Sequence, residues 1–153
     1  MCWLLFYFMW GNLTQESFNP FDPAANNRQT MTISLNDGSS EQITIIVVHR
    51  ESPHYLNICL QSIHLMSNLN NYEIIVVDNG SGQETQEYLD VLQNEGIKII
   101  RNDKNLFWSK AVNQGIKAAD PNSKYFVFMH ADTVVLDQAW LDVLINISEA
   151  KGA

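Results

Sequence analysis

The strongest indication of the fold is Tyr72-Glu73-Ile74-Ile75-Val76-Val77-Asp78-Asn79-Gly80-Ser81, where an apolar run ends in an acid and a polar turn. A similar run follows later in the chain as Tyr125-Phe126-Val127-Phe128-Met129-His130-Ala131-Asp132. Short, continuous apolar runs are typical of strands that are buried on both faces of a parallel sheet. Each predicted strand delivers an aspartate at its carboxyl end, which is the edge where open α/β sheets bind ligands. We therefore expect Asp78 and Asp132 to lie at neighbouring strand ends and to form a ligand site.

Strand and helix patterns alternate through most of the chain. Apolar, β-branched runs predict strands at residues 43–48, 74–78, 97–100 and 124–129. Apolar residues at helical spacing predict helices between and after them, at residues 53–66, 83–94, 107–119 and 137–149. This alternation predicts an α/β fold, a Rossmann-like parallel sheet with helices on both faces.

The helix ends carry signals of their own. Ser52 and Pro53 fit the N-cap and the first position of the first helix. Asp137 is predicted to cap the last helix, and Gly96 to end the second. Residues 68–71 predict a turn. The residues of the first helix that are expected to face the core are Leu56, Cys59, Leu60 and Ile63.

Composition limits the class of protein. The chain has 153 residues, of which 46% are hydrophobic and 17% charged, and its formal net charge is −8. These values predict one globular domain at residues 43–150, preceded by a poorly ordered extension at residues 1–42. There is no basic stripe to neutralise phosphates, so nucleic acid is not expected as a partner.

The cysteines and the N-terminal residues indicate the cellular location of the protein. Cys2 and Cys59 are far apart in the sequence and lack metal-ligand spacing, which favours a reducing cytosol, and Cys59 is predicted to pack in the core. The apolar run at residues 1–10 is too short to span a bilayer, because a spanning helix takes about 20 residues. We expect a cytoplasmic protein, and peripheral association with a membrane stays open.

Asp78 is the leading candidate for a ligand-binding residue. The segment that follows it, Asn79-Gly80-Ser81-Gly82, offers a flexible backbone whose N–H groups can approach a ligand. It is not the dinucleotide fingerprint, because it follows the second predicted strand and lacks the third glycine. The alternative is structural: Asp78 only forms the turn.

His130 and Asp132 form a second candidate. Residues two apart in an extended chain project on the same face, so an imidazole and a carboxylate there could share a divalent cation. The alternative is that His130 and Asp132 have only a structural role at the end of the strand and bind no cation.

The third element is a polar loop that leads into a helix, residues 101–115. Gly115 lies inside the predicted helix and costs about 1 kcal/mol relative to alanine, so close packing is expected there. Lys110 either reaches a phosphate or stays in solvent. Phe107 and Trp108 either cover the site or fill the core.

From Ile43 to about Glu149 the chain resembles the N-terminal half of the family 2 glycosyltransferases, which have the GT-A fold. Four blocks carry the resemblance, in the family's order. They are ITIIVV at residues 43–48 followed by Ser52-Pro53, IIVVDNGS at 74–81, RNxxNL at 101–106 with AxNxG at 111–115, and FMHADTV at 128–134.

The resemblance implies roles at a nucleotide-sugar donor. In the family, the first aspartate contacts the nucleotide base, and Asp78 matches it. The last acid of an Asp-x-Asp-like motif binds a divalent metal, Mn²⁺ or Mg²⁺, on the donor diphosphate, and Asp132 matches it. His130 stands at the first position of that motif and is expected as a second metal ligand. The other residues expected at the donor nucleotide are Asn79, Asn105, Asn113 and Ala131, which match motif positions, and Lys110, which could reach a phosphate.

The chain departs from the family at three places. The first strand of the family commonly ends in Thr-Tyr-Asn, where this chain has His49-Arg50-Glu51. The glycine after Asn-Leu is Phe107, and the first acid of the metal motif is His130.

The implied reaction is transfer of a sugar from a nucleotide-sugar donor to a hydroxyl of a saccharide or lipid-linked acceptor, as in cell-wall or polysaccharide biosynthesis. Family members continue past the metal motif into an acceptor-binding half that carries the catalytic base, whereas this chain ends at Ala153. We expect a truncated, donor-binding chain that is inactive alone, with no catalytic residue assigned. Two alternatives stay open: a degenerate nucleotide-binding module without catalysis, and a flavodoxin-like regulatory domain that binds Mg²⁺ at its acidic edge.

Overall fold

The computed structural model describes residues 42–67 and 72–151. These residues belong to one of the two units into which the chain divides, residues 31–153. The predicted extension before residue 42, including Cys2, and the predicted turn at residues 68–71 lie outside the described residues. Within the described residues, no helix is long and apolar enough to cross a membrane.

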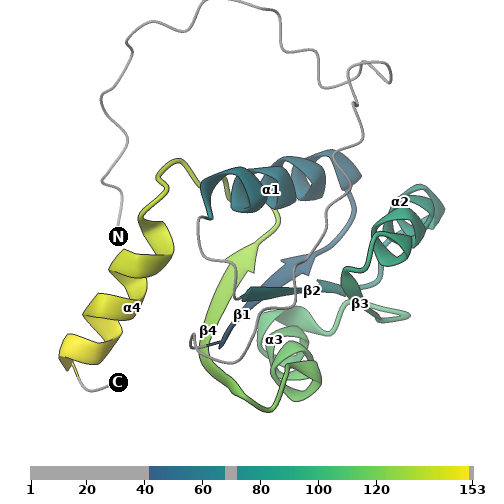
Figure 1. Ribbon diagram of the computed structural model, residues 1–153. Helices are drawn as coiled ribbons and strands as arrows, with labels where there is room; N and C mark the ends of the chain where they lie inside the picture. The colour runs from purple at the N-terminus through teal and green to yellow at the C-terminus, as the bar shows by residue number, and fades with distance from the viewer. Residues whose placement is uncertain (1–41, 68–71, 152–153) are drawn as a thin grey trace, which may run out of the picture. The chain divides into compact units, whose positions relative to one another are not determined.

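Strands and helices alternate along the described chain, as predicted (Figure 1). The strands are β1 (Gln42–His49), β2 (Tyr72–Asp78), β3 (Lys98–Arg101) and β4 (Ser123–His130). The helices are α1 (Pro53–Met66), α2 (Gln83–Asn94), α3 (Phe107–Ala118) and α4 (Trp140–Lys151). Each predicted element is present, and only the start of α4 differs by more than two residues from its prediction.

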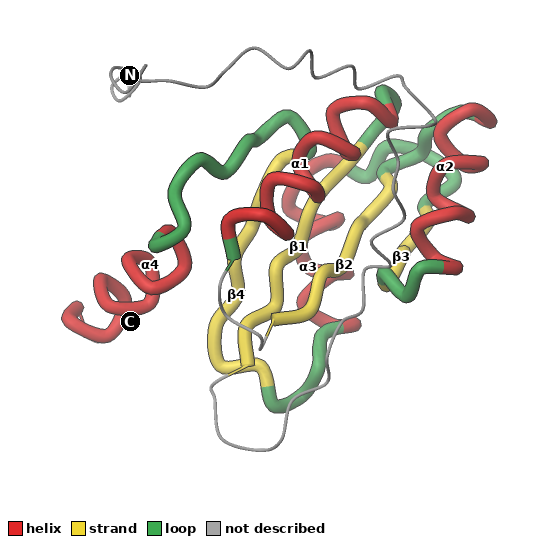
Figure 2. The backbone as a smooth tube through the Cα atoms, turned by 45° about the horizontal axis from the view of Figure 1, so that its top comes forward, coloured by secondary structure: helices red, strands yellow, loops and turns green. Residues whose placement is uncertain are grey.

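The strands form one sheet in the order β3-β2-β1-β4, and every pair is parallel (Figure 2). Val48 of β1 pairs with Val77 of β2 on one side and with His130 of β4 on the other. The order changes direction at β1, so the switch point of the sheet lies between β1 and β4. The expectation that Asp78 and Asp132 follow neighbouring strands is wrong, because β1 lies between β2 and β4. Two inter-strand steps separate their strands by about 10 Å.

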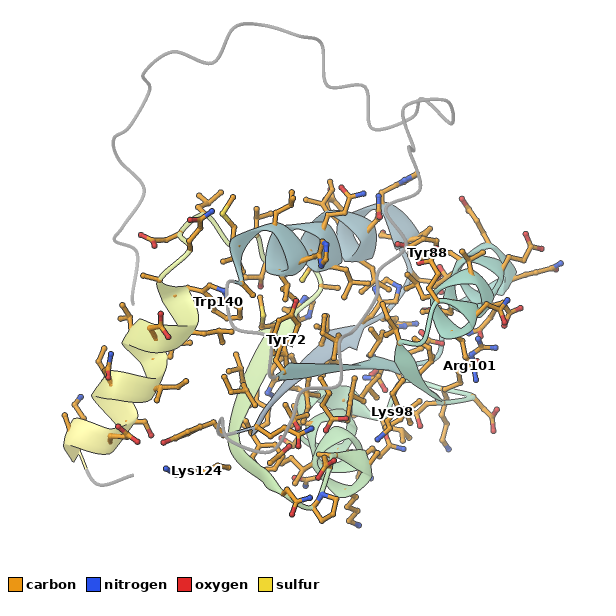
Figure 3. The ribbon with its side chains drawn as sticks, in the orientation of Figure 1. Tyr72, Tyr88, Lys98, Arg101, Lys124 and Trp140 are labelled. Atoms are coloured by element: carbon orange, nitrogen blue, oxygen red, sulfur yellow. The ribbon has the colours of Figure 1, made fainter. Side chains whose placement is uncertain are left out.

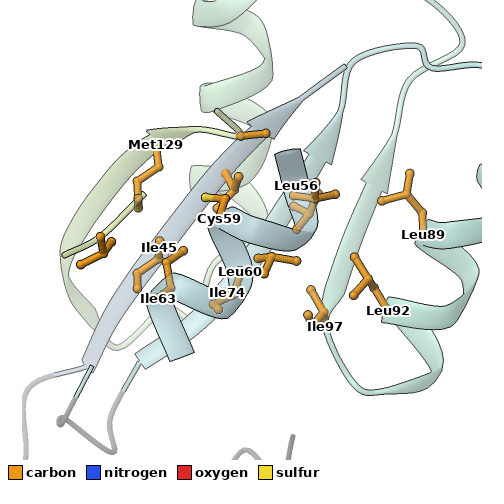
Figure 4. Packing of buried hydrophobic residues seen from close by; sticks show 14 of the residues in the cluster. Ile45, Leu56, Cys59, Leu60, Ile63, Ile74, Leu89, Leu92, Ile97 and Met129 are labelled. Carbon is orange, nitrogen blue, oxygen red and sulfur yellow. The ribbon is translucent and has the colours of Figure 1, made fainter. Parts of the chain in front are cut away.

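Helices cover both faces of the sheet. One face carries the larger apolar cluster, in which residues of α1 and α2 pack on β1, β2 and β4 (Figure 4). The opposite face carries a smaller cluster of β1, β2 and α3 residues. Leu56, Cys59, Leu60 and Ile63 of α1 are all buried, as their spacing predicts. Burial raises the pKa of the Cys59 thiol to about 11, which suits a core position. Tyr88 of α2 donates from its hydroxyl to Asn57 of α1 at 3.1 Å and links the two helices (Figure 3).

Gly115 lets α3 approach the sheet. A Cβ atom added at Gly115 would lie 2.5 Å from Cγ2 of Ile46 in β1. No side chain fits at that distance, so the predicted close packing is confirmed. Because α3 lies so close to β1, the first turn of the helix is held beside the carboxyl ends of the central strands.

One predicted N-cap is confirmed and one is wrong. Ser52 occupies the N-cap position of α1 and Pro53 the first helical position, as predicted, although the φ of Ser52 is 55° and its hydroxyl caps no N–H group of the helix. Asp137 accepts from Ala139 N at 2.8 Å, and the helix begins only at Trp140. Gly96, with φ of 95° and its N–H donated to Gln93 O, follows the end of α2 as predicted.

Helix α4 lies beside the edge strand β4. Leu141 is buried, and Trp140 donates from Nε1 to Ser67 Oγ at 3.2 Å (Figure 3). A largely apolar cleft of about 590 Å³ lies between α4 and β4. Neither His130 nor Asp132 lines it, so this cleft is distinct from the carboxyl edge of the sheet.

Candidate functional site at the carboxyl edge of the sheet

Asp78 is fully buried at the end of β2. Its carboxylate accepts hydrogen bonds from the Ser81 hydroxyl, from Ser81 N at 3.4 Å and from Gln86 Nε2 at 2.6 Å. Gln86 lies one turn into α2, and no motif in the sequence singles it out. The carboxylate of Asp78 therefore anchors both the turn and the start of α2.

Asn79 ties two loops together. Its Nδ2 donates to Asn105 Oδ1 at 2.8 Å, and its Oδ1 accepts from Leu106 N at 2.8 Å. Gly80, with φ of 85°, leaves room for the backbone of Lys104, which would lie 2.6 Å from an added Cβ. The loops after β2 and β3 thus meet over the sheet edge, and the expected pair Asn79 and Asn105 is in direct contact.

His49 is buried at the end of β1, where it pairs in register with Asp78. Its Nε2 atom is buried and has no hydrogen-bond partner among the described residues. Burial lowers the pKa of His49, the nearby charges of Asp78 and Glu51 oppose this shift, and His130 adds to it. A neutral imidazole is therefore favoured at this position.

His130 and Asp132 lie at the end of β4, on the far side of β1 from Asp78. Nδ1 of His130 is 2.9 Å from Oδ1 of Asp132, and both side chains are well exposed. The predicted juxtaposition of imidazole and carboxylate is present. Ala131, between them, is buried and donates from its backbone N to Val48 O at 3.2 Å, which holds this turn against β1.

Trp108, in the first turn of α3, stacks on the imidazole of His130. The ring centroids are 5.8 Å apart and the planes differ by 15°. Aromatic pairs at this separation contribute about 0.5–1.5 kcal/mol beyond the area they bury. The sequence predicted covering the site as one of two roles for Trp108 but did not identify His130 as its stacking partner. The two rings meet because side chains alternate between faces along β4, so that His130 projects toward α3.

Phe107 begins α3 with φ of 64°, and its residue is 76% exposed. Trp108 is 42% exposed, so neither aromatic fills the core and that alternative is wrong. A left-handed conformation costs a non-glycine residue about 1–2 kcal/mol. This backbone conformation accounts for the preference for glycine that the resemblance implies at this position.

Lys110 and Asn113 lie on the exposed side of α3. Within residues 42–67 and 72–151, neither side chain forms a hydrogen bond or an ion pair. The structure therefore leaves these two predicted residues in solvent and does not bring them into contact with Asp78 or Asp132.

The pair His130 and Asp132 fits a divalent cation. Nδ1 and Oδ1 are 2.9 Å apart and contact each other directly, which requires a proton on Nδ1. Once that proton is lost, the same spacing suits two ligand atoms at right angles, because atoms about 2.1 Å from an ion then lie about 3 Å apart. No group of three or more His, Cys, Asp or Glu side chains in the described part of the chain could hold a metal. Any ion would then take its remaining ligands from water or from a bound phosphate, which is common for Mg²⁺.

Solved structures share this fold. The N-terminal residues 1–349 of Staphylococcus aureus TarS match with a TM-score of 0.58 and 19% identity, covering 71% of this chain and 32% of that one. TarS has also been solved with UDP-GlcNAc. The mannosyltransferase PcManGT from Pyrobaculum calidifontis, solved with GDP-Man and Mn²⁺, matches with a TM-score of 0.60 and 15% identity, covering 72% and 33%. The chain spans about a third of the length of these proteins, and the shared fold is the N-terminal part of GT-A.

Comparison of the sequence with curated proteins found no match. The sequence profile described as Glycosyl transferase family 2 matches residues 44–153, which is well over half of the chain. It includes β1 from Thr44 onward, the other three strands and all four helices described above. Apart from Ile43, the residues whose motifs suggested the resemblance lie within it. The chain therefore belongs to glycosyl transferase family 2.

Proposed function

We propose that residues 43–150 form the donor-binding part of a metal-dependent glycosyltransferase, which transfers a sugar from a nucleotide sugar to an acceptor hydroxyl. The observation that carries this proposal is the His130–Asp132 pair beside the switch point of a GT-A sheet. Open α/β sheets bind ligands at this point. The solved relatives with UDP-GlcNAc and with GDP-Man and Mn²⁺ support a nucleotide-sugar donor and a divalent cation.

His130 and Asp132 would hold the cation through Nδ1 and Oδ1. When bound, the cation would offset the charge that develops on the leaving diphosphate. A diphosphate without a cation would meet the carboxylate of Asp132 in a chain of net charge −8, so the donor and the cation should bind together. Nδ1 must be unprotonated to ligate, which leaves the proton of the neutral imidazole on Nε2.

Asn79 and Asn105 would support the donor by fixing the loops after β2 and β3. Asp78 already accepts hydrogen bonds from Ser81 and Gln86. A base N–H that reached this carboxylate would have to replace one of these donors. Lys110 and Asn113 would contribute only after a change of side-chain conformation, because both point to solvent.

The test is calorimetric titration of the folded protein with UDP, GDP and dTDP, each with and without Mn²⁺ or Mg²⁺. We expect binding of at least one nucleotide that depends on the cation. Asp132→Asn should abolish the effect of the cation, and His130→Ala should weaken it. Asp142→Asn, a matched change of an exposed aspartate on α4, should leave binding unchanged. Absence of binding to all three nucleotides would overturn the proposal.

A nucleotide-binding module without transfer is the second candidate function. The observation that favours it is the engagement of Asp78 by its own turn and helix. Nucleotide binding that needs neither Asp132 nor a cation would support this candidate. Cation-dependent binding that is lost in Asp132→Asn would favour the transferase.

A further inference from the structure

We propose that Trp108 is a positioning residue for the cation site and makes it favour Mn²⁺ over Mg²⁺. The inference rests on the proposed function, since it concerns the same His130–Asp132 pair. It adds a residue of a different helix and a preference among cations, which neither the sequence motif nor the solved relatives assign.

The geometry of the stack supports this role. His130 is the last residue of an edge strand and its side chain is 61% exposed, so Trp108 and Asp132 supply the contacts described for its ring. Trp108 covers one face of the imidazole at a centroid distance of 5.8 Å and an interplanar angle of 15°. Rotation about the Cα–Cβ bond of His130 would break this stack. A half-turn of the ring about its Cβ–Cγ bond would keep it. Trp108 therefore fixes the plane of the imidazole, and the contact with Asp132 selects the orientation in which Nδ1 lies 2.9 Å from Oδ1.

The position of Trp108 is itself well defined. The residue lies in the first turn of α3, which Gly115 holds against Ile46 of β1. The start of the helix is fixed further, because Asn79 accepts from Leu106 N and Asn105 accepts from Phe107 N, each at 2.8 Å. Trp108 thus transmits the position of a packed helix to a side chain on the edge strand.

The chemistry of the two donor atoms gives the preference. Carboxylate oxygen suits both Mg²⁺ and Mn²⁺, whereas imidazole nitrogen suits transition metals better than Mg²⁺. Mg²⁺ should bind mainly through Asp132 and lose little when His130 is misplaced. Mn²⁺ should use both residues and depend on how well His130 is oriented. Residues that orient metal ligands typically change metal affinity by about 10- to 100-fold when replaced.

The test uses metal ions alone, with the full chain and no nucleotide. Free Mn²⁺ is measured by electron paramagnetic resonance, and Mg²⁺ by its competition with Mn²⁺. Trp108→Leu should weaken Mn²⁺ binding about tenfold and should lower the preference for Mn²⁺ over Mg²⁺. Trp108→Phe, which can still stack, should restore most of both. Phe128→Leu is the matched control, because it changes an aromatic residue of similar exposure on β4 for which no ring stack with His130 is found among the described residues.

A double-mutant cycle tests whether Trp108 acts through His130. In a His130→Ala background, Trp108→Leu should cause no further loss of Mn²⁺ affinity. Equal losses in the two backgrounds would overturn the positioning role. Mn²⁺ should also broaden the indole N–H resonance of Trp108 and spare that of Trp140. Broadening of neither would contradict the proposed location.

The outcomes separate this inference from the proposed function. If Asp132→Asn leaves Mn²⁺ binding unchanged, the cation site itself is wrong. If Asp132→Asn abolishes binding while Trp108→Leu has no effect on Mn²⁺ affinity, only the role of Trp108 is wrong.

Discussion

Glu51 caps helix α2 from a different loop, because both oxygens of its carboxylate lie 3.1 Å from the backbone nitrogen of Gly82. Gly82 is the N-cap residue of α2 and has no side chain with which to satisfy the free N–H groups of the first turn. Glu51 also donates from its own backbone N to the Ser81 hydroxyl at 2.7 Å. The contact joins the loops after β1 and β2 and sets a negative charge at the positive end of the helix dipole.

Glu51→Ala should lower the free energy of unfolding by about 1 kcal/mol, the typical value of an N-cap. Glu51→Gln should cost less, because an acceptor oxygen remains. Urea denaturation followed by circular dichroism is the measurement. Glu95→Gln removes the same charge at the other end of α2 and should be neutral or slightly stabilising. Equal losses at both ends would show that Glu51 is not a cap.

Phe107→Gly should stabilise the protein by up to about 1 kcal/mol. The substitution relieves a φ of 64° at a residue that is 76% exposed, and this relief exceeds the entropy that glycine adds to the unfolded chain. Ser109→Gly, an exposed residue of the same helix without a positive φ, should instead destabilise by about 0.5–1 kcal/mol. The two substitutions should therefore shift the midpoint of thermal unfolding in opposite directions. A loss of stability in Phe107→Gly would mean that the ring packs better than its exposure indicates.

Gly115→Ala should destabilise the protein by about 1–3 kcal/mol, as overpacking does. The added methyl group would lie 2.5 Å from Cγ2 of Ile46. In an Ile46→Ala background, which removes that atom, Gly115→Ala should become neutral or stabilising because alanine favours helix. Chemical denaturation of the four proteins gives the coupling energy. A cost that persists in the Ile46→Ala background would contradict this packing argument.

Stability should fall as the pH drops below about 6.5, the usual pKa of histidine. Burial lowers the pKa of His49 in the folded protein, so the unfolded chain binds a proton first and the stability from the neutral imidazole is lost with falling pH. His49→Phe should remove this part of the acid sensitivity. His64→Phe, at an exposed position on α1, should keep it. Denaturation midpoints between pH 8 and pH 5 test the difference, and parallel curves for wild type and His49→Phe would disprove it.

The local pattern of apolar and polar residues was sufficient to predict the helices and strands and the faces that they bury. The run before Asp78 predicted β2, and the spacing of Leu56, Cys59, Leu60 and Ile63 predicted the buried face of α1. Gly115 was recognised as a packing position from its cost in a helix. These features depend on residues within a few turns or strand positions, where hydrophobic periodicity reports burial directly.

The N-cap position of Ser52 was predicted correctly, but its hydrogen bonding was not, because that depends on distant residues. Ser52 and Glu51 both take a left-handed conformation, and Glu51 uses that geometry to reach Gly82, 31 positions along the chain. A side chain that caps one helix from the loop of another leaves no local signal, so Ser52 matched the N-cap pattern of α1 without forming the expected hydrogen bond.

The residues that end the strands can be recognised in the sequence alone, because a change from apolar to polar side chains marks each strand end. Which of these ends meet depends on the tertiary fold. The order β3-β2-β1-β4 separates Asp78 from Asp132 by a strand, and the packing of α3 brings Trp108 onto His130. Strand order follows from how the connecting helices pack on the two faces of the sheet, which is a non-local property that no single segment of the sequence encodes.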